Sequence, residues 1–350
     1  MKLKIVALYC LRAAGVFALC RSLTRSKLRI LCYHGFAVGD QHEYNPALYM
    51  KPRTFEARLR TLRRLGYPVV SLQRGLALLS RNEVANCETV ITIDDGWQTT
   101  YSLAAPILKS LSLCATIYVT SYYSERGTDV FNVALRYLMW RARPQSVVIA
   151  DFDPRIDGTY QSPQGPEAIA AAIISRAEIH LQAPDRQRLL AYLVARVGVP
   201  HATTLGQFRL ISPAEITELA ADGFDMQLHT HRHRLSMDDR DEVAREIADN
   251  RQRLEGWTGA AARHLCYPSG KYAQQHPEWL RELGVESATT CEPGLNDQVT
   301  DPHRLRRFLD SEAFAEIEFE AELSGLGSVL RRLKPRSLGG SNEGLFFRSR

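Results

Sequence analysis

An apolar, β-branched segment at residues 90–93 runs directly into two carboxylates and a glycine, Asp94-Asp95-Gly96. The segment predicts a buried strand. Two like charges at the end of a strand repel each other unless a metal ion or a proton stabilises them. A strand-ending turn that caps the next helix is the simpler interpretation of an Asp-Gly pair. It explains poorly why two acids should end an otherwise apolar strand, so we favour a functional carboxylate pair.

A histidine cluster much later in the chain supplies complementary ligands. Residues 229–233 read His-Thr-His-Arg-His. On a helical turn, His229 and His233 share one face and can bind one metal ion, while His231 points elsewhere. In an extended segment all three would share a face; we favour the turn. Two imidazoles and a carboxylate leave coordination positions open for water and substrate, and a divalent ion lowers the pKa of such a water toward about 7.

Short apolar segments alternate with amphipathic ones along most of the chain. This alternation is typical of βα units around a parallel sheet or barrel, whose active sites lie at the carboxyl ends of the strands. His34, the acid pair and His229 all follow predicted strand ends. Residues 122–212 break the alternation with helix-forming, proline-punctuated sequence, which predicts an insertion or lid. Strands are expected near residues 28–33, 68–72, 89–93, 115–119, 223–228 and 265–270, and helices near 54–65, 72–79, 100–111 and 239–256.

Composition restricts the partners and the compartment. The net charge of +5 over 350 residues is a mild basic excess, which gives no indication of nucleic-acid binding. The seven cysteines are an odd number without a Cys-x-x-Cys pair, so a disulfide framework is not expected and a reducing compartment is favoured. Residues 5–20 are apolar but shorter than the about 20 residues of a membrane span. They predict either an N-terminal helix packed on the body or an interfacial membrane helix.

These features divide the chain into three parts. Residues 1–27 are the N-terminal helix, residues 28–320 the barrel with its insertion, and residues 321–350 a basic tail. The tail is expected to be flexible and solvated, with contact to an anionic lipid or polymer as the alternative.

The two motifs together resemble those of a known family. Residues 92–96, Thr-Ile-Asp-Asp-Gly, are similar to the TFDDG motif of the NodB-type polysaccharide deacetylases, carbohydrate esterase family 4. Residues 229–233 match that family's H-[ST]-x-x-H motif. The resemblance spans roughly residues 28–310, the insertion excepted. It implies a distorted (β/α) barrel, a divalent metal that is commonly zinc, and hydrolysis of N-acetyl groups from amino sugars in a polymer.

The resemblance also assigns roles to the motif residues. The general base is Asp94, and the metal ligands are Asp95, His229 and His233. Zinc is the expected metal, although the same donor set suits cobalt, nickel or iron.

A histidine near the first predicted strand is the candidate general acid. Residues 31–34, Leu-Cys-Tyr-His, resemble the exopolysaccharide branch of the family, in which a Tyr-His histidine takes the place of a C-terminal acid. This resemblance assigns the acid role to His34. The alternative is a buried histidine bonded to the backbone.

The third family motif, usually R-x-P-[FY], is altered here. Residues 266–269 read Cys-Tyr-Pro-Ser, so the arginine that normally orients the base is missing. Arg307 is the candidate to supply that charge from another strand. The backbone N–H of Ser269 is the candidate oxyanion donor, because Pro268 has none. Tyr267 and Trp97 are either sugar-stacking residues or core aromatics.

The sequence therefore predicts a metal-dependent hydrolase that removes N-acetyl groups from a polysaccharide or its lipid-linked oligosaccharide precursor. Two other interpretations stay open: a metal-dependent amidase acting on a small non-sugar amide, and a non-catalytic polysaccharide-binding relative. Reduced cysteines without a cleavable signal favour a cytoplasmic location, with the inner face of the membrane as a docking surface.

Overall fold

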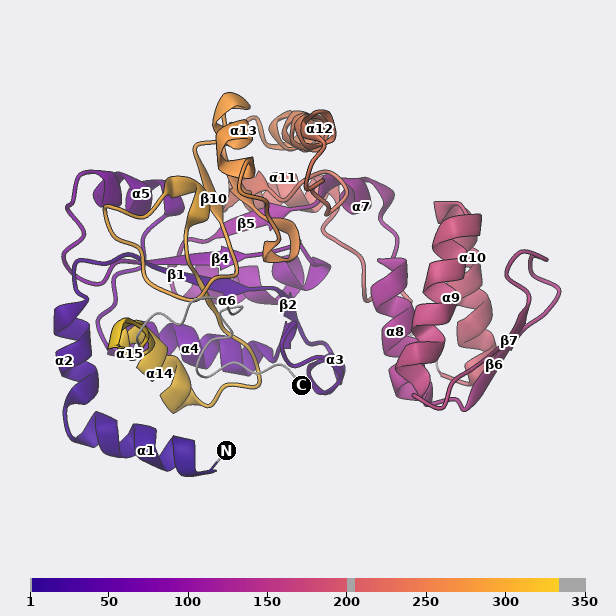
Figure 1. Ribbon diagram of the computed structural model, residues 1–350, viewed down its shortest axis with the longest axis horizontal. Coiled ribbons are helices and arrows are strands. Elements are labelled where there is room, and N and C mark those ends of the chain that lie inside the picture. Colours follow the sequence, from indigo (N-terminus) through magenta and orange to yellow (C-terminus); the bar gives the residue numbers. More distant parts are fainter. Residues whose placement is uncertain (1, 200–204, 334–350) are drawn as a thin grey trace.

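One parallel sheet forms the centre of the molecule. The computed structural model describes residues 2–199 and 205–333. Seven strands lie in the order β10-β9-β8-β5-β4-β1-β11, and each neighbouring pair is parallel. The sheet curls into a half-barrel surrounded by helices (Figure 1), which confirms the predicted distorted barrel. Its strands are β1 (Arg29–Tyr33), β4 (Thr89–Ile93), β5 (Thr116–Val119), β8 (Asp225–Leu228), β9 (His264–Cys266), β10 (Ser287–Thr289) and β11 (Phe308–Leu309).

Helices cover the sheet between its strands. A short parallel pair, β2 (Gly35–Phe36) and β3 (Tyr49–Met50), and the single turn α3 (Gln41–Tyr44) follow β1. The covering helices are α4 (Pro52–Arg64), α5 (Leu72–Ser80), α6 (Ala105–Ser110), α11 (Pro213–Ala221), α12 (Arg240–Thr258), α13 (His276–Glu282) and α14 (Glu316–Leu323). A π-helical turn η1 (Thr100–Ala104) precedes α6, and 3-10 turns form η3 (Pro268–Gly270) and η4 (Pro302–Arg304).

Two local predictions in the first third of the chain are wrong. Helix α4 begins at Pro52 rather than at residue 54, because proline suits the first helical turn, where its missing N–H is not needed. The strand expected over 68–72 is reduced to a single bridge between Val69 and Thr89. There the side chain of Ser71 accepts a hydrogen bond from the Arg74 N–H and caps α5, so the helix begins where the strand was expected to end.

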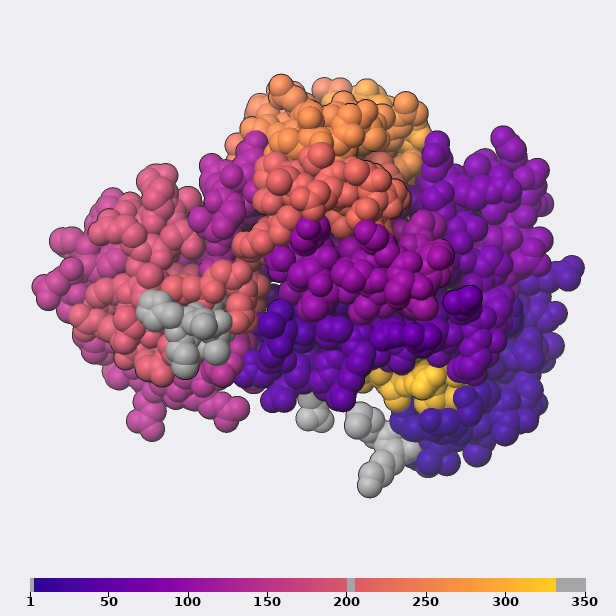
Figure 2. Space-filling model, turned by 180° about the vertical axis from the view of Figure 1, so that it is seen from behind, coloured from indigo at the N-terminus to yellow at the C-terminus, as the bar shows by residue number. Residues whose placement is uncertain are grey.

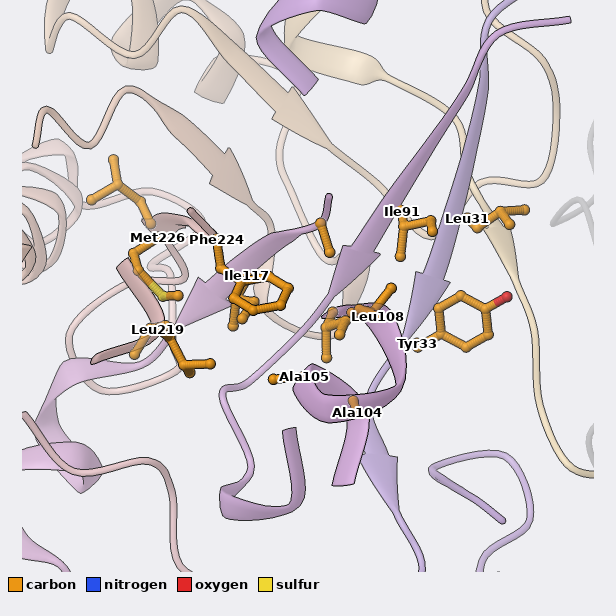
Figure 3. Close-up of a cluster of buried hydrophobic side chains, with 14 of the residues drawn as sticks. Leu31, Tyr33, Ile91, Ala104, Ala105, Leu108, Ile117, Leu219, Phe224 and Met226 are labelled. Carbon is orange, nitrogen blue, oxygen red and sulfur yellow. The ribbon is translucent and has the colours of Figure 1, made fainter. Parts of the chain in front are cut away.

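The sheet is buried on both faces, which explains why its strands are continuous apolar runs. All five residues of β1 and of β4 are buried. On one face, Leu31, Ile91 and Ile117 pack with Leu108 of α6 and with residues of α11, as Figure 3 shows. Alternate side chains of the same strands face the other way, and those at the carboxyl ends form the site described below.

Residues between β5 and α11 leave the sheet and build a separate lobe. Its elements are α8 (Phe131–Ala142), the antiparallel hairpin β6 (Ser146–Ile149) and β7 (Gly158–Gln161), α9 (Pro166–His180) and α10 (Ala183–Val197). The preceding helix α7 (Ser121–Arg126) packs on α12 of the barrel. The lobe has its own apolar cluster, which includes Leu138, Ile173 and Leu190. Figure 1 shows it beside the carboxyl ends of the strands, and Figure 2 shows it projecting from one side of the molecule. The expected insertion is therefore a folded unit, and a lid function stays a prediction.

Two short helices begin the chain. Helices α1 (Lys2–Ala13) and α2 (Val16–Leu23) meet at Gly15, whose φ of 77° is readily adopted only by glycine. They pack through Leu8, Phe17 and Cys20 on α14 and on α15 (Leu326–Leu333). Within the described ranges, no single helix is long and apolar enough to cross a membrane. The two helices pass that test only as a pair, bent by 73°.

The predicted flexible tail is wrong for its first part. Residues 321–333 contain the end of α14 and all of α15. Ala321, Leu323 and Leu326 are buried, and their apolar contacts stabilise the helices. Residues 334–350, the remainder of the predicted tail, lie outside the described residues.

Candidate metal centre

The carboxyl ends of four strands bring the predicted site residues together. His34 follows β1, the acid pair follows β4, His229 follows β8, and Cys266 ends β9. Asp95 and Gly96 adopt φ values of 70° and 78°, so the chain turns sharply after β4. A Cβ on Gly96 would add to the strain of this left-handed turn. Asp95 does carry a Cβ, so its backbone is strained at a residue whose side chain belongs to the site.

Asp95, His229 and His233 form a cluster whose ligand atoms all lie within 4.8 Å of one another. The Nε2 atoms of His229 and His233 are 3.1 and 3.3 Å from the same oxygen, Asp95 Oδ1. Burial alone would raise the pKa of Asp95, but hydrogen bonds from the two imidazoles outweigh it and hold the pKa well below its ordinary value. The three residues therefore present an ionised carboxylate and two ring nitrogens toward one point.

The predicted helical turn in the histidine motif is wrong. Residues 229–233 form an irregular loop in which Thr230 and His233 have φ values of 61° and 56°. These two left-handed residues turn both rings toward Asp95, so the ligand spacing is achieved without a helix. His231 is directed elsewhere, as expected: its Nδ1 lies 2.9 Å from Ser121 Oγ.

A second layer of contacts fixes the ligands. His229 Nδ1 lies 2.8 Å from the carbonyl oxygen of Cys266. A ring that donates its Nδ1–H there leaves the Nε2 lone pair for a metal. Asn250 accepts a hydrogen bond from the His229 backbone N–H at 2.9 Å, and the Trp97 indole donates to Asp95 Oδ2 at 2.8 Å. Two imidazoles and a carboxylate with this support fit a divalent cation such as zinc.

The other acid of the pair, Asp94, is held by a buried arginine. Arg307 Nη1 and Nη2 donate to Asp94 Oδ1 and Oδ2, both at 2.7 Å. The remaining N–H groups of Arg307 reach Thr290 O, Thr92 Oγ1 and Cys266 Sγ. Burial alone would raise the pKa of Asp94, but the charge and hydrogen bonds of Arg307 outweigh it and hold the pKa well below the ordinary value. Arg307 thus supplies the cation beside Asp94 that the third motif, with Cys266 in place of arginine, does not supply.

His34 lies beside this pair. Its Nε2 is 3.7 Å from Asp94 Oδ2, and its side chain is 20% exposed. A partly exposed ring that faces the acid pair differs from a core histidine bonded to the backbone, which was the alternative interpretation. The structure gives the position of His34, and its role as an acid stays a prediction.

The third-motif loop is exposed at Ser269 and buried at the aromatic residues. Ser269 has a φ of 55° within η3, and its N–H has no hydrogen-bond acceptor among the described residues. Tyr267 is fully buried, stacks on Tyr272 and donates to the carbonyl oxygen of His303. Trp97 is 5% exposed. Neither aromatic side chain is available as a platform for a sugar ring.

Three contacts of the acid pair were not predicted from the sequence. The thiols of Cys32 and Cys266 lie 3.4 and 3.3 Å from Asp94 Oδ2. Burial raises the pKa of both thiols well above its ordinary value, so they remain protonated and can donate weakly to the carboxylate. Cysteine in an apolar strand is interpreted as a small hydrophobe, and nothing in the sequence distinguishes these two. The third contact is the Trp97 indole, whose position two residues after Asp95 was the available signal.

One part of the chain matches a known protein family. The family model described as "Polysaccharide deacetylase" matches residues 177–288. The predicted family resemblance is confirmed. The deacetylase match contains His229 and His233, whereas Asp94 and Asp95 lie outside it and join the histidines through the fold.

A curated relative and several solved structures agree with this result. YxkH of Bacillus subtilis strain 168, whose assignment as a polysaccharide deacetylase is itself provisional, is 30% identical over 95 residues. The match covers 27% of this chain and 32% of that relative, so it spans about a third of the relative's length.

The structural likenesses extend over most of the chain. The Streptococcus pyogenes deacetylase PplD in complex with acetate has a TM-score of 0.56 at 18% identity, with 88% of this chain and 99% of that chain covered. IcaB from Ammonifex degensii has a TM-score of 0.55 at 18% identity, with 85% and 97% covered. BC0361, a polysaccharide deacetylase from Bacillus cereus, has a TM-score of 0.52 at 17% identity, with 85% and 69% covered. At these identities the likeness establishes the fold.

Proposed function

We propose that this protein is a metal-dependent hydrolase that removes N-acetyl groups from amino sugars of a polysaccharide or of its lipid-linked precursor. The strongest support is that the neighbouring carboxylates Asp94 and Asp95 have different partners. Asp95 lies against two imidazoles, and Asp94 is paired with an arginine. One acid is thus available as a metal ligand, while the other, kept ionised by Arg307, is available to accept a proton.

Asp95, His229 and His233 would hold the metal. The cation would act there as a Lewis acid on the amide carbonyl and lower the pKa of water toward about 7. Zinc is the first candidate, with cobalt, nickel and iron as alternatives for the same ligands.

Asp94 is the proposed general base. The bidentate pair with Arg307 keeps its carboxylate ionised and fixes its orientation. Because the pKa of Asp94 is held low, it can take a proton efficiently only from a water whose own pKa has been lowered. Water attacks the acetyl carbonyl carbon, and its proton passes to Asp94.

Ser269 and His34 complete the proposed reaction. The unpaired N–H of Ser269 is the proposed donor to the oxyanion that develops on the acetyl oxygen. His34, beside Asp94 and partly exposed, is proposed to protonate the departing nitrogen as the C–N bond breaks. The products are acetate and a free amine on the sugar. The Tyr-His sequence at residues 33–34 supports placement in the exopolysaccharide branch.

The structure weakens the case for a binding-only relative. That interpretation rested on the arginine missing from the third motif. Arg307 occupies a bidentate position on Asp94, so a cation faces the proposed base even though it comes from another part of the chain.

The direct test is acetate release from acetylated chito-oligosaccharides by the purified protein. Activity is expected to disappear with a chelator and to return with zinc. Asp94→Asn should abolish turnover while keeping about one metal per chain, and His34→Ala should lower kcat by at least about 100-fold with metal content intact. A metal-loaded wild type that releases acetate only from small non-sugar amides, or from nothing, would overturn the proposal.

A further inference from the structure

Helix α1 presents apolar side chains to solvent as well as to the body of the molecule. Leu3, Val6 and Tyr9 point to solvent with exposures of 84%, 57% and 47%. Two cations of the helix pair with acids of α14: Lys4 with Glu318 at 2.5 Å, and Arg12, whose side chain is 45% exposed, with Glu320 at 3.2 Å. A helix whose outer side meets only water normally carries polar or charged residues there.

Helix α2 also exposes apolar side chains. Leu19 and Leu23 are 60% and 63% exposed, whereas Phe17 and Cys20 on the other side are buried against α14 and α15. Both helices therefore pack on the body with one side and expose apolar side chains on the other. We call the set Leu3, Val6, Tyr9, Leu19 and Leu23 the outer face.

The packing of the inner side decides how such helices can meet a bilayer. The pair has the length and composition of a membrane segment but is bent by 73°, and its inner side is anchored by ion pairs and apolar contacts to α14. Crossing the membrane would break those contacts. Lying in the interface would keep them and bury only the outer face.

We propose that the outer face docks on the surface of an anionic lipid bilayer. Charge supports this partner over an apolar protein surface. Arg25, directly after α2, is exposed. Residues 334–350 carry four cations and one acid, and they follow α15, which lies beside α2 (Figure 1). Arg25 and the excess of cations in the sequence after α15 favour anionic headgroups as the partner.

Vesicle binding by the full chain tests the proposal without relying on catalysis. Wild-type protein is expected to co-sediment with vesicles of phosphatidylglycerol and phosphatidylethanolamine and much less with phosphatidylcholine alone. The double variant Leu3→Glu/Val6→Glu should bind on the order of 100-fold more weakly, since two apolar side chains no longer enter the interface. Both positions are exposed, so circular dichroism should be unchanged.

Ile179→Glu is the matched control. Ile179 is 72% exposed but belongs to α9 in the lobe, so this variant should bind vesicles like wild type. Equal binding by the wild type and the double variant, or no binding by the wild type, would overturn the proposal. So would conversion of a lipid-free dimer to a monomer by the double variant, because a second copy of the chain would then cover the outer face. Acetate release by the same samples reports separately on the proposed function.

Discussion

Replacing Arg307 by methionine tests the buried pair on which the proposed base depends. The substitution keeps most of the side-chain volume and removes five hydrogen bonds, two of them to Asp94. Because the arginine side chain is 0% exposed and that of Asp94 3% exposed, water cannot replace the lost partner. Removing one member of a buried pair typically costs about 3–5 kcal/mol, and we expect that loss in the free energy of unfolding at pH 7.

The loss should depend on pH in a defined direction. In the wild type the pKa of Asp94 is lowered, so its stabilising contribution is present above the unfolded pKa of about 3.9 and disappears as the pH falls through the lower folded value. In the variant, burial without a cation raises that pKa above the unfolded value. The variant therefore loses stability as the pH rises, and its deficit should shrink between pH 7 and pH 4.

Urea unfolding followed by circular dichroism, with a chelator present, measures both effects without charge compensation from a metal. The companion variant Asp94→Asn and the double variant Arg307→Met/Asp94→Asn complete a double-mutant cycle. We expect a coupling energy of at least about 2 kcal/mol, because the double variant leaves no buried charge unpaired. A deficit that is the same at pH 4 and pH 7, or two single costs that simply add, would refute the reasoning.

Three further predictions concern the metal centre and the lobe boundary. His229→Gln should retain less than about a tenth of the metal after dialysis, as measured by plasma mass spectrometry, since one of three ligands is lost. Trp97→Phe removes the hydrogen bond to Asp95 Oδ2 and should weaken metal affinity about 10–100-fold in competition with a chelator; unchanged affinity would contradict a role for the indole. Glu215→Ala removes the capping-box carboxylate of α11, which is also paired with Arg209, and should cost about 1–2 kcal/mol at pH 7. Arg209 and the Ser212 N–H lower the Glu215 pKa to about 2 despite burial, so in pH-dependent thermal melts this cost should persist at pH 5 and decline only below the unfolded pKa of about 4.3.

Sequence patterns predicted five of the seven sheet strands and the nearness of the acids to the histidines, but they missed the short strands β10 and β11. Strand periodicity and the polar residues after each strand depend on local sequence, and parallel topology then places strand ends at one edge. The conformation of the histidine loop was not predictable in this way. A helical turn and a loop with Thr230 and His233 at positive φ can both turn the two rings to one side, and the sequence spacing does not distinguish them.

Long-range and competing effects account for the other differences. The break at Gly15 divides the predicted single N-terminal helix in two; glycine tolerates the positive φ of the break, and both halves then pack on α14 and α15. The thiol contacts of Cys32 and Cys266 with Asp94 depend on how the sheet curls. Arg307 was a candidate only because the third motif lacked an arginine, and its pairing became visible only in three dimensions.

The separation of Asp94 and Arg307 has a consequence for biosynthesis. The two residues lie 213 positions apart, and at about 5–20 residues per second the ribosome needs roughly 10–40 s to travel from one to the other. During that interval the nascent strand that bears the acid pair has no cation to neutralise it in the interior, so the barrel cannot close around it. The chain is therefore expected to acquire its reactive geometry only when synthesis is nearly complete, and a product truncated before residue 307 should be held by chaperones or degraded rather than released as a partly active protein.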